Sequence, residues 1–259
     1  MRHFRNEQRA RGRTVHYHAL GHRAADDRGS SFGDILASDV KRLRPDRLIV
    51  TRPGDLRVLR ILDRAASELG VELEVRGDRH FFVTPSAFRD WADGKKQLVL
   101  EHFYRTQRRR TGLLMQSDGK PEGGQWNFDK DNRETFGRQG PGDVPRPKRF
   151  RPDETTREVL DMVAARFADH PGSLEDFDLP VTHDQALAAL RDFISRRLAD
   201  FGAYEDAMWS GEAALYHSRL SAVLNVKLLD AKFCLEEIVA AYRRGEAPLN
   251  SVEGFVRQV

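Results

Sequence analysis

The chain has 259 residues, of which 39% are hydrophobic and 32% charged, a balance typical of a soluble globular protein. No apolar run approaches the roughly 20 residues that cross a bilayer, and the charged start MRHFRNEQRARGR does not have the pattern of a secretory signal. The single Cys234 excludes an internal disulfide framework and suits a reducing compartment. We therefore expect a cytoplasmic protein without a membrane partner.

Charge is distributed unevenly along the chain, although the formal net charge is only +3. Residues 1–152 carry 32 Lys and Arg against 21 Asp and Glu, whereas residues 153–259 carry 11 against 19. A basic half beside an acidic half indicates either two domains that attract one another or an anionic partner of the first half. The sequence alone leaves both explanations open.

Residues 1–115 alternate short β-rich runs with helical patterns, which predicts an α/β domain. A helix is predicted over 1–11, and strands follow at 13–20, 46–51 and 71–77. Strands connected through helices form a parallel sheet with right-handed crossovers, so we expect a thin βαβαβ, Rossmann-like arrangement. The loop 51–55 lies at the carboxyl edge where ligands collect, although an ordinary Pro-Gly turn is its simpler explanation. His16 and His18 share a strand face, but no third ligand stands at a recognisable spacing, so no metal site is predicted.

The string HFYRTQRRR (102–110) places Arg105, Arg108 and Arg109 at helical spacing, with His102 and Arg110 beside them. Such a stripe suits phosphate groups, whereas a solvated helix face is the usual explanation of a charge run.

Residues 116–152 are rich in Gly and Pro and have no sustained periodicity, which predicts an interdomain connection. Within it, WNFDKDNR (126–133) has too many polar side chains for a plain linker, and we expect this string to pack against the helical domain that follows.

From residue 153 onward the sequence predicts helices only, with an acidic first turn at 153–154, a Thr182 cap and helix ends at Gly202 and Gly245. Ser218 and Ser221 stand at the start of the helical pattern Leu220, Val223, Leu224, Leu228. Ser218 is expected to cap this helix, and both hydroxyls together with the free N–H groups would then hold an anion such as phosphate. The alternative is a capped core helix without a ligand.

The stretch from Tyr204 to Ala222 resembles the flavin-binding signature of the photolyase/cryptochrome family, in which a Tyr precedes a Thr-Ser-x-Leu-Ser-Pro turn that holds the FAD phosphates. Here the turn reads His217-Ser218-Arg219-Leu220-Ser221-Ala222, with His217 in place of Thr and Ala222 in place of Pro. The His form is similar to the iron–sulfur bacterial branch, whose members resemble repair enzymes for the six-four photoproduct. Further strings resemble the same branch over nearly the whole chain: WADGKKQL (91–98), HFYRTQRRR (102–110), GLLMQSDGKPEGGQWNFDKDNR (112–133) and APLNSVEGFVRQ (247–258).

The resemblance implies a fold that is α/β and then all-α: an α/β antenna domain at 1–115, a connection at 116–152 and the first part of a helical FAD-binding domain at 153–259. It implies light-driven repair of pyrimidine photoproducts in DNA by electron transfer from reduced FAD, a carbon–carbon lyase reaction that needs no catalytic acid, base or nucleophile. Arg105 and Arg109 are the candidate DNA-binding residues. The residues implied to bind FAD are Tyr204, His217, Ser218, Leu220 and Ser221.

The chain departs from the family in extent. It lacks the four cysteines that hold the branch's iron–sulfur cluster, and in the family its first helix follows two strands and its last helix continues further. The sequence thus looks truncated at both ends, and we expect the chain alone to be incomplete and inactive. The resemblance allows an antenna chromophore in the complete protein, which we expect to be a monomer. A cryptochrome-like blue-light photoreceptor without repair and an inactive remnant are the alternative functions.

Overall fold

The computed structural model describes residues 1–259 and divides into two compact units. Unit 1 comprises residues 1–79 and 151–177, and unit 2 comprises residues 80–150 and 178–259. The chain therefore passes between the units three times, and segments far apart in sequence share a unit. The domain boundaries predicted after residues 115 and 152 stay a prediction.

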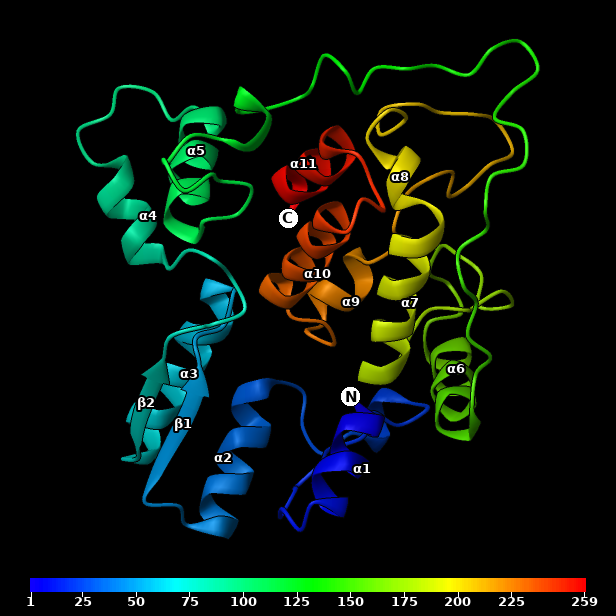
Figure 1. Cartoon of the computed structure of the whole chain (residues 1–259). Helices are drawn as coiled ribbons and strands as arrows, with labels where there is room; N and C mark the ends of the chain where they lie inside the picture. Colours follow the sequence, from blue (N-terminus) through cyan, green and yellow to red (C-terminus); the bar gives the residue numbers. More distant parts are fainter. The chain divides into compact units, whose positions relative to one another are not determined.

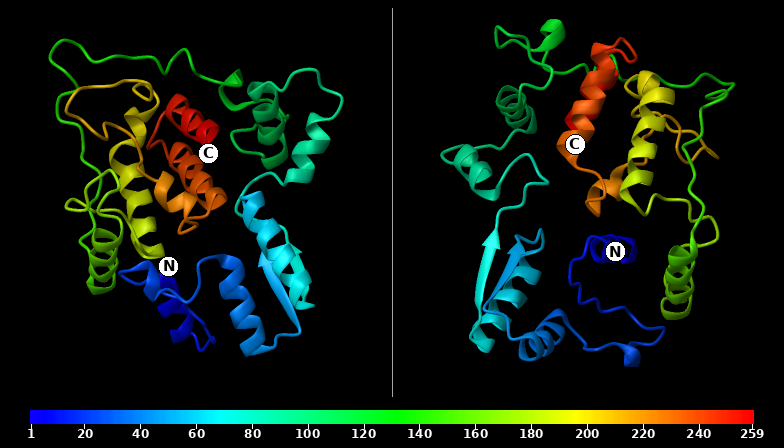
Figure 2. Two further views of the ribbon diagram at one scale, coloured as in Figure 1. Left: turned by 180° about the vertical axis from the view of Figure 1, so that it is seen from behind. Right: turned by 60° about the horizontal axis from the view of Figure 1, so that its bottom comes forward.

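Unit 1 is built around a parallel sheet of two strands, β1 (Arg47–Thr51) and β2 (Glu72–Arg76), in which Val50 lies opposite Val75. Helix α3 (Leu56–Leu69) connects the strands and packs against β2, and α2 (Phe32–Leu43) packs against α3 (Figures 1 and 2). This β–α–β connection confirms the α/β prediction for the first part of the chain. Ser31 and Asp55 cap the two helices by accepting a backbone N–H, and Gly70 ends α3 at a φ of +66°.

The predicted strand at 13–20 does not form. Residues 13–20 belong to no strand of the sheet, because β1 and β2 pair only with each other. A β-rich sequence becomes a strand only where a partner supplies ladder hydrogen bonds, so the expected βαβαβ arrangement is reduced to βαβ. His18 of this segment instead contacts α2, with its Nε2 2.6 Å from a carboxylate oxygen of Asp39. The loop 51–55 is an ordinary turn in which Asp55 caps α3 and binds Arg57.

Helices α1 (Arg2–Ala10) and α6 (Glu154–Arg166) complete unit 1 together with a short 3-10 turn, Ala24–Asp26. Helix α1 confirms the helix predicted over 1–11. Three polar pairs join the first part of the chain to the α6 segment: Arg2 with Glu158 at 2.9 Å, His3 with Asp153 at 2.7 Å, and Arg166 with Asp27 at 2.7 Å. These pairs explain why α6 packs with α1 although about 150 residues separate them in the chain.

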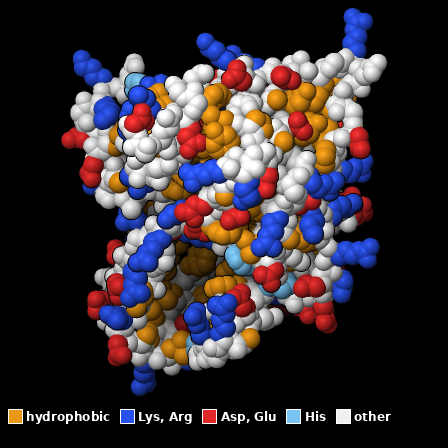
Figure 3. All heavy atoms as spheres, in the orientation of Figure 1, with side chains coloured by type: hydrophobic (Ala, Val, Ile, Leu, Met, Phe, Trp, Pro, Cys, Tyr) orange, Lys and Arg blue, Asp and Glu red, His pale blue; other side chains and the backbone are white.

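The uneven charge along the chain is not a property of either unit. Because the acidic segment 151–177 belongs to unit 1, that unit carries 20 Lys and Arg against 19 Asp and Glu, and unit 2 carries 23 against 21. Figure 3 shows side chains of both signs interspersed over the visible face, with apolar side chains between them. Any anionic partner must therefore be recognised by a local cluster of cations, because neither unit has a large overall excess of positive charge.

Unit 2 is helical, which confirms the all-α prediction for the second part of the fold. Its helices are α4 (Pro85–Ala92), α5 (Leu100–Thr111), α7 (His183–Arg196), α8 (Leu198–Phe201), α9 (Ser221–Asn225), α10 (Ala231–Arg243) and α11 (Leu249–Gln258), and Glu122–Gly124 is a 3-10 turn. The core is formed by apolar side chains of α7, α8, α10 and α11, joined by Tyr104 of α5 and Leu114. Thr182 and Asp230 cap α7 and α10. No helix of the chain is both long and apolar enough to cross a membrane.

Helices α8 and α11 pack unusually closely at Gly202. A Cβ atom at this position would lie 2.5 Å from the Cα of Ser251, so only glycine fits. The backbone N–H of Gly202 donates to the Ser251 hydroxyl at 2.9 Å, and that hydroxyl donates to the carbonyl of Ala199 at 2.8 Å. The contact fixes α11 against the end of α8. The ring of Phe201 in α8 lies 5.9 Å from that of His217. His217 begins the segment 217–221, whose Ser218 and Ser221 are predicted to hold phosphate and which we call the cradle.

Candidate functional site

The predicted cradle lies on the segment that leads into α9. This helix is shorter than the pattern Leu220 to Leu228 predicts, because the chain leaves it at Val226 and Lys227 takes a left-handed φ of +60°. The predicted cap is also wrong, since the residue at the N-cap position of α9 is Leu220 and no side chain caps the helix. The Ser218 hydroxyl instead accepts the backbone N–H of Leu220 at 3.3 Å, which closes a tight turn before the helix.

The side chains of the cradle differ in their access to a ligand. His217 and Ser221 are exposed and Ser218 is half-buried, so all three can reach a bound anion. Leu220 is only 1% exposed and packs in the core, so its side chain cannot touch a ligand. The first N–H groups of α9, which begin at Ser221, have no partner within the helix and add backbone donors beside the hydroxyls.

Arg219 adds positive charge between the two serines. Its guanidinium pairs with Asp178 at 2.7 Å, and Arg149 pairs with the same carboxylate at 2.9 Å. The hydrogen bond from Arg219 is the main reason why the pKa of Asp178 is lowered. A cavity of about 10 Å³ lies between Ser218, Arg219 and Asp178, which is room for about one water molecule. The carboxylate of Asp178, which lines this cavity with Ser218, is thus neutralised by two arginines.

Tyr204 occupies a different kind of environment from the serines. Its ring lies in a stack between Phe136, at a centroid distance of 4.7 Å, and Tyr216, at 5.4 Å. Desolvation and the nearby carboxylate of Glu134 raise the pKa of Tyr204. No hydrogen bond joins Tyr204 to Ser218 or Ser221. The four predicted residues His217, Ser218, Leu220 and Ser221 lie on one continuous segment. Tyr204 lies in a ring stack that adjoins this segment through Tyr216.

The donors present at the cradle fit a phosphate group. Two serine hydroxyls, the His217 imidazole and the N–H groups at the start of α9 are groups that can donate hydrogen bonds to an anion, and Arg219 supplies a neighbouring cation. An FAD diphosphate is a ligand of this chemistry. Of the five predicted residues, His217, Ser218 and Ser221 have side chains that can reach such a ligand, and the role of each residue stays a prediction.

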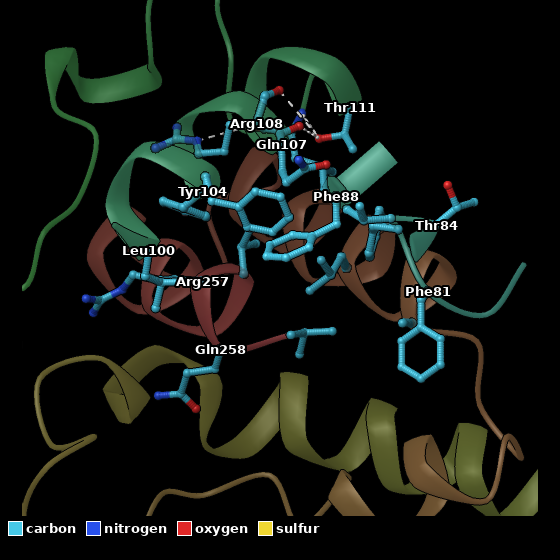
Figure 4. A pocket seen from close by; sticks show the side chains of 18 of the residues that line it. Phe81, Thr84, Phe88, Leu100, Tyr104, Gln107, Arg108, Thr111, Arg257 and Gln258 are labelled. Carbon is cyan, nitrogen blue, oxygen red and sulfur yellow. Dashed lines mark hydrogen bonds between the residues drawn. The ribbon is translucent and has the colours of Figure 1, made fainter. Parts of the chain in front are cut away.

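A larger apolar pocket of about 650 Å³ lies between α4, α5, α10 and α11 (Figure 4). Phe81, Phe88 and Leu235 are among the residues that line it, and none of the five predicted cofactor residues does so. Burial and the carboxylate of Glu253, which accepts the Tyr104 hydroxyl at 2.8 Å, raise the pKa of Tyr104 at its edge. The sequence analysis missed this pocket, although the apolar run of residues 80–88 is a signal that could have indicated it.

The basic stripe on α5 contains residues of two kinds. Arg108 is only 1% exposed, and its guanidinium donates to the carbonyls of Leu113, Leu114 and Trp126. The prediction of a uniform phosphate-binding or solvated face is therefore wrong for Arg108, which is a structural residue of the interior. Arg109 is exposed and Arg105 is half-exposed, with its Nε donating to Glu101 at 2.8 Å. Only these two remain candidates for contacts with phosphate.

The string 126–133 packs against the helical part of unit 2, which confirms the prediction. The N–H of Phe128 donates to the buried Glu253 of α11 at 3.0 Å, and Asp129 pairs with Arg257 at 2.8 Å. Asn132 is buried and donates to the carbonyl of Asn250 at 3.2 Å. The string therefore helps to hold α11 in place.

Comparison with known proteins agrees with these observations. The model of the deoxyribodipyrimidine photo-lyase-related protein family matches residues 1–179. A protein described as (6-4) photolyase from Agrobacterium fabrum (strain C58 / ATCC 33970) is 43% identical over 261 residues, which cover 100% of this chain and 50% of that protein. A small parallel α/β unit together with a helical unit agrees with the fold expected of a photolyase-related protein. The chain belongs to the deoxyribodipyrimidine photo-lyase-related protein family and spans about half the length of the curated relative it matches.

Proposed function

We propose that this chain is part of a flavoprotein that repairs pyrimidine photoproducts in DNA by a light-driven reaction, with the six-four photoproduct as its substrate. The observation that carries the proposal is the 43% identity to a (6-4) photolyase along the whole of the chain. The proposal is supported by the donors that surround the start of α9, because these suit the phosphates of FAD. A cytoplasmic location and a monomeric state stay predictions.

In this proposal the residues of the chain bind and orient the cofactor. Ser218, Ser221 and His217 hold the FAD phosphates together with the N–H groups of α9, and Leu220 anchors the turn in the core. Bound reduced FAD supplies the electron that reverts the photoproduct. The protein must also stabilise the photoproduct outside the base stack, at a cost of a few kcal/mol that is smaller for damaged bases.

The test uses the protein in its natural reading frame, purified and examined for flavin absorption. A duplex that carries one six-four photoproduct is then incubated with it in blue light and in the dark. We expect bound flavin and loss of the photoproduct in light only. Flavin without repair would contradict the proposal and favour the blue-light photoreceptor, and absence of flavin would favour the inactive remnant.

The two accessible arginines of α5 lead to a prediction about salt dependence. If Arg105 and Arg109 contact DNA phosphates, changing both to alanine lowers the slope of log affinity against log salt by about two, roughly one for each lost contact. The slope is measured by titrating duplex DNA at several salt concentrations. Arg60→Ala is the control, because Arg60 is also exposed but lies on α3. An unchanged slope in the double variant would show that the two arginines form only a solvated face.

A further inference from the structure

Trp126 is surrounded by arginines. The guanidinium carbon of Arg109 lies 4.5 Å from the centroid of the indole, and those of Arg105 and Arg108 lie 5.5 Å from it. All three arginines belong to α5, and no other ring or cation contacts the indole. Trp126 is half-buried, so part of the residue stays accessible to solvent beside α5.

Two of the three guanidinium groups are available to an external anion. Arg108 is held inside the protein by three carbonyls. The guanidinium of Arg109 makes no hydrogen bond within the chain, and that of Arg105 uses only its Nε, which donates to Glu101. Glu101 is the acidic group that faces this cluster, and it accepts hydrogen bonds from Arg105 and from Asn127. The cluster thus keeps free donors beside an aromatic face.

The backbone that carries the indole is fixed on both sides. The carbonyl of Trp126 accepts a hydrogen bond from Arg108 at 2.8 Å, and the N–H of Phe128 donates to the buried Glu253 of α11 at 3.0 Å. Between them, the amide of Asn127 donates to Glu101 at 3.2 Å. The backbone of Trp126 is therefore held in place before any ligand binds, so a ligand that stacks on the ring requires little additional ordering of the protein.

An aromatic ring flanked by free cations is the combination that binds single-stranded nucleic acids. Every base has a π-face that stacks on an aromatic side chain, and neighbouring cations contact the backbone phosphates. We propose that Trp126 stacks with an unpaired base of DNA while Arg109 and Arg105 bind the adjacent phosphates. The bases of an intact duplex already stack on their neighbours and do not reach the ring. The proposal rests on the proposed function only for the choice of DNA as the ligand.

The test measures binding of a thymidine oligonucleotide of about 12 nucleotides and of an undamaged duplex of the same length, in the dark. We expect Trp126→Ala to weaken single-strand binding by about tenfold, the loss typical of one base–aromatic stack, and to leave duplex binding unchanged. Trp126→Phe retains most of the affinity. The loss in Trp126→Ala persists at high salt because stacking involves no counterion release, whereas Arg109→Ala lowers the salt slope.

Trp209→Ala is the matched control, because Trp209 is 39% exposed, lies in the same unit and contacts no arginine. Trp126→Leu is compared with Trp126→Phe, so that a ring is distinguished from apolar volume even if the alanine variant does not fold. Equal single-strand affinity of the Leu and Phe variants, or an equal loss in Trp209→Ala, overturns the proposal. The assay requires neither light nor flavin, so its failure leaves the repair proposal standing, and a failure of repair does not affect this result.

Discussion

Replacing Arg108 by methionine is expected to lower the free energy of unfolding of unit 2 by about 3 kcal/mol or more. The guanidinium of Arg108 donates to three carbonyls, those of Leu113, Leu114 and Trp126, and the side chain is almost completely buried. Methionine retains much of the apolar stem but no donor. The carbonyl of Leu114 keeps the backbone N–H of Glu122 at 2.8 Å, whereas those of Leu113 and Trp126 lose their donor. Each buried acceptor left without a partner costs about 1–3 kcal/mol, so the two together are a large part of the stability of a domain.

Urea denaturation followed by far-ultraviolet circular dichroism measures this effect. We expect a lower urea concentration at the midpoint and an unchanged dependence of the free energy of unfolding on urea concentration. Arg109→Met is the matched control on the same helix. Arg109 is exposed and loses only its contact with the indole of Trp126, which is worth about 0.5–1 kcal/mol. Equal midpoints for the Arg108 and Arg109 variants would contradict a structural role of Arg108.

The second expectation concerns the cradle: the double change Ser218→Ala and Ser221→Ala weakens retention of FAD at least tenfold. Each hydroxyl is expected to donate a charge-assisted hydrogen bond to the diphosphate, and such bonds contribute about 1.5–3 kcal/mol each. The changes are mild for the fold, since Ser221 is exposed and Ser218 accepts only the N–H of Leu220. A lower affinity at unchanged stability would therefore report the loss of ligand contacts.

Flavin occupancy after gel filtration of the flavin-loaded protein is the measurement, with thermal unfolding as a check on the fold. Ser117→Ala is the control, because Ser117 is exposed and lies outside the cradle. Full flavin occupancy in the double variant would show that the two serines do not bind the cofactor. In that case the arginine beside them, Arg219, would be no more than the partner of Asp178.

The signals of individual helices could be read from the sequence because they are local. Thr182 precedes α7 and accepts a hydrogen bond from the N–H of Gln185, as a cap requires. The strings 153–167, with its acidic first turn, and 250–259 likewise predict helices, and these correspond to α6 and α11. The turn at Ser218 was predicted incorrectly, because its hydroxyl can accept either the first N–H groups of a helix or the nearer N–H of Leu220. Propensity does not distinguish these two local bonds.

Long-range partners decided the features that the sequence analysis did not predict. Residues 13–20 have the composition of a strand, but no strand of the sheet pairs with them. Arg108 and Arg109 are neighbours in a charge run, yet Arg108 is buried with its guanidinium on the carbonyls of the turn after α5 and of Trp126, whereas Arg109 is exposed. Neither result follows from spacing, because both depend on which segment arrives opposite a given side chain.

The sequence by itself determined the family, the α/β and helical halves of the fold, and the stretch from His217 to Ser221 as the candidate cofactor site, because each depends on contiguous motifs. The tertiary structure decided that residues 151–177 pack with the first 79 residues, which makes both units nearly neutral. It also decided that the string 126–133 fixes α11 and that Trp126 lies beside the exposed Arg109 and beside Arg105, which pairs with Glu101. The packing of 151–177 with the first segment and the position of α11 depend on hydrogen bonds between residues more than 100 positions apart in the chain, as between Phe128 and Glu253, and local sequence patterns carry no information about such pairs.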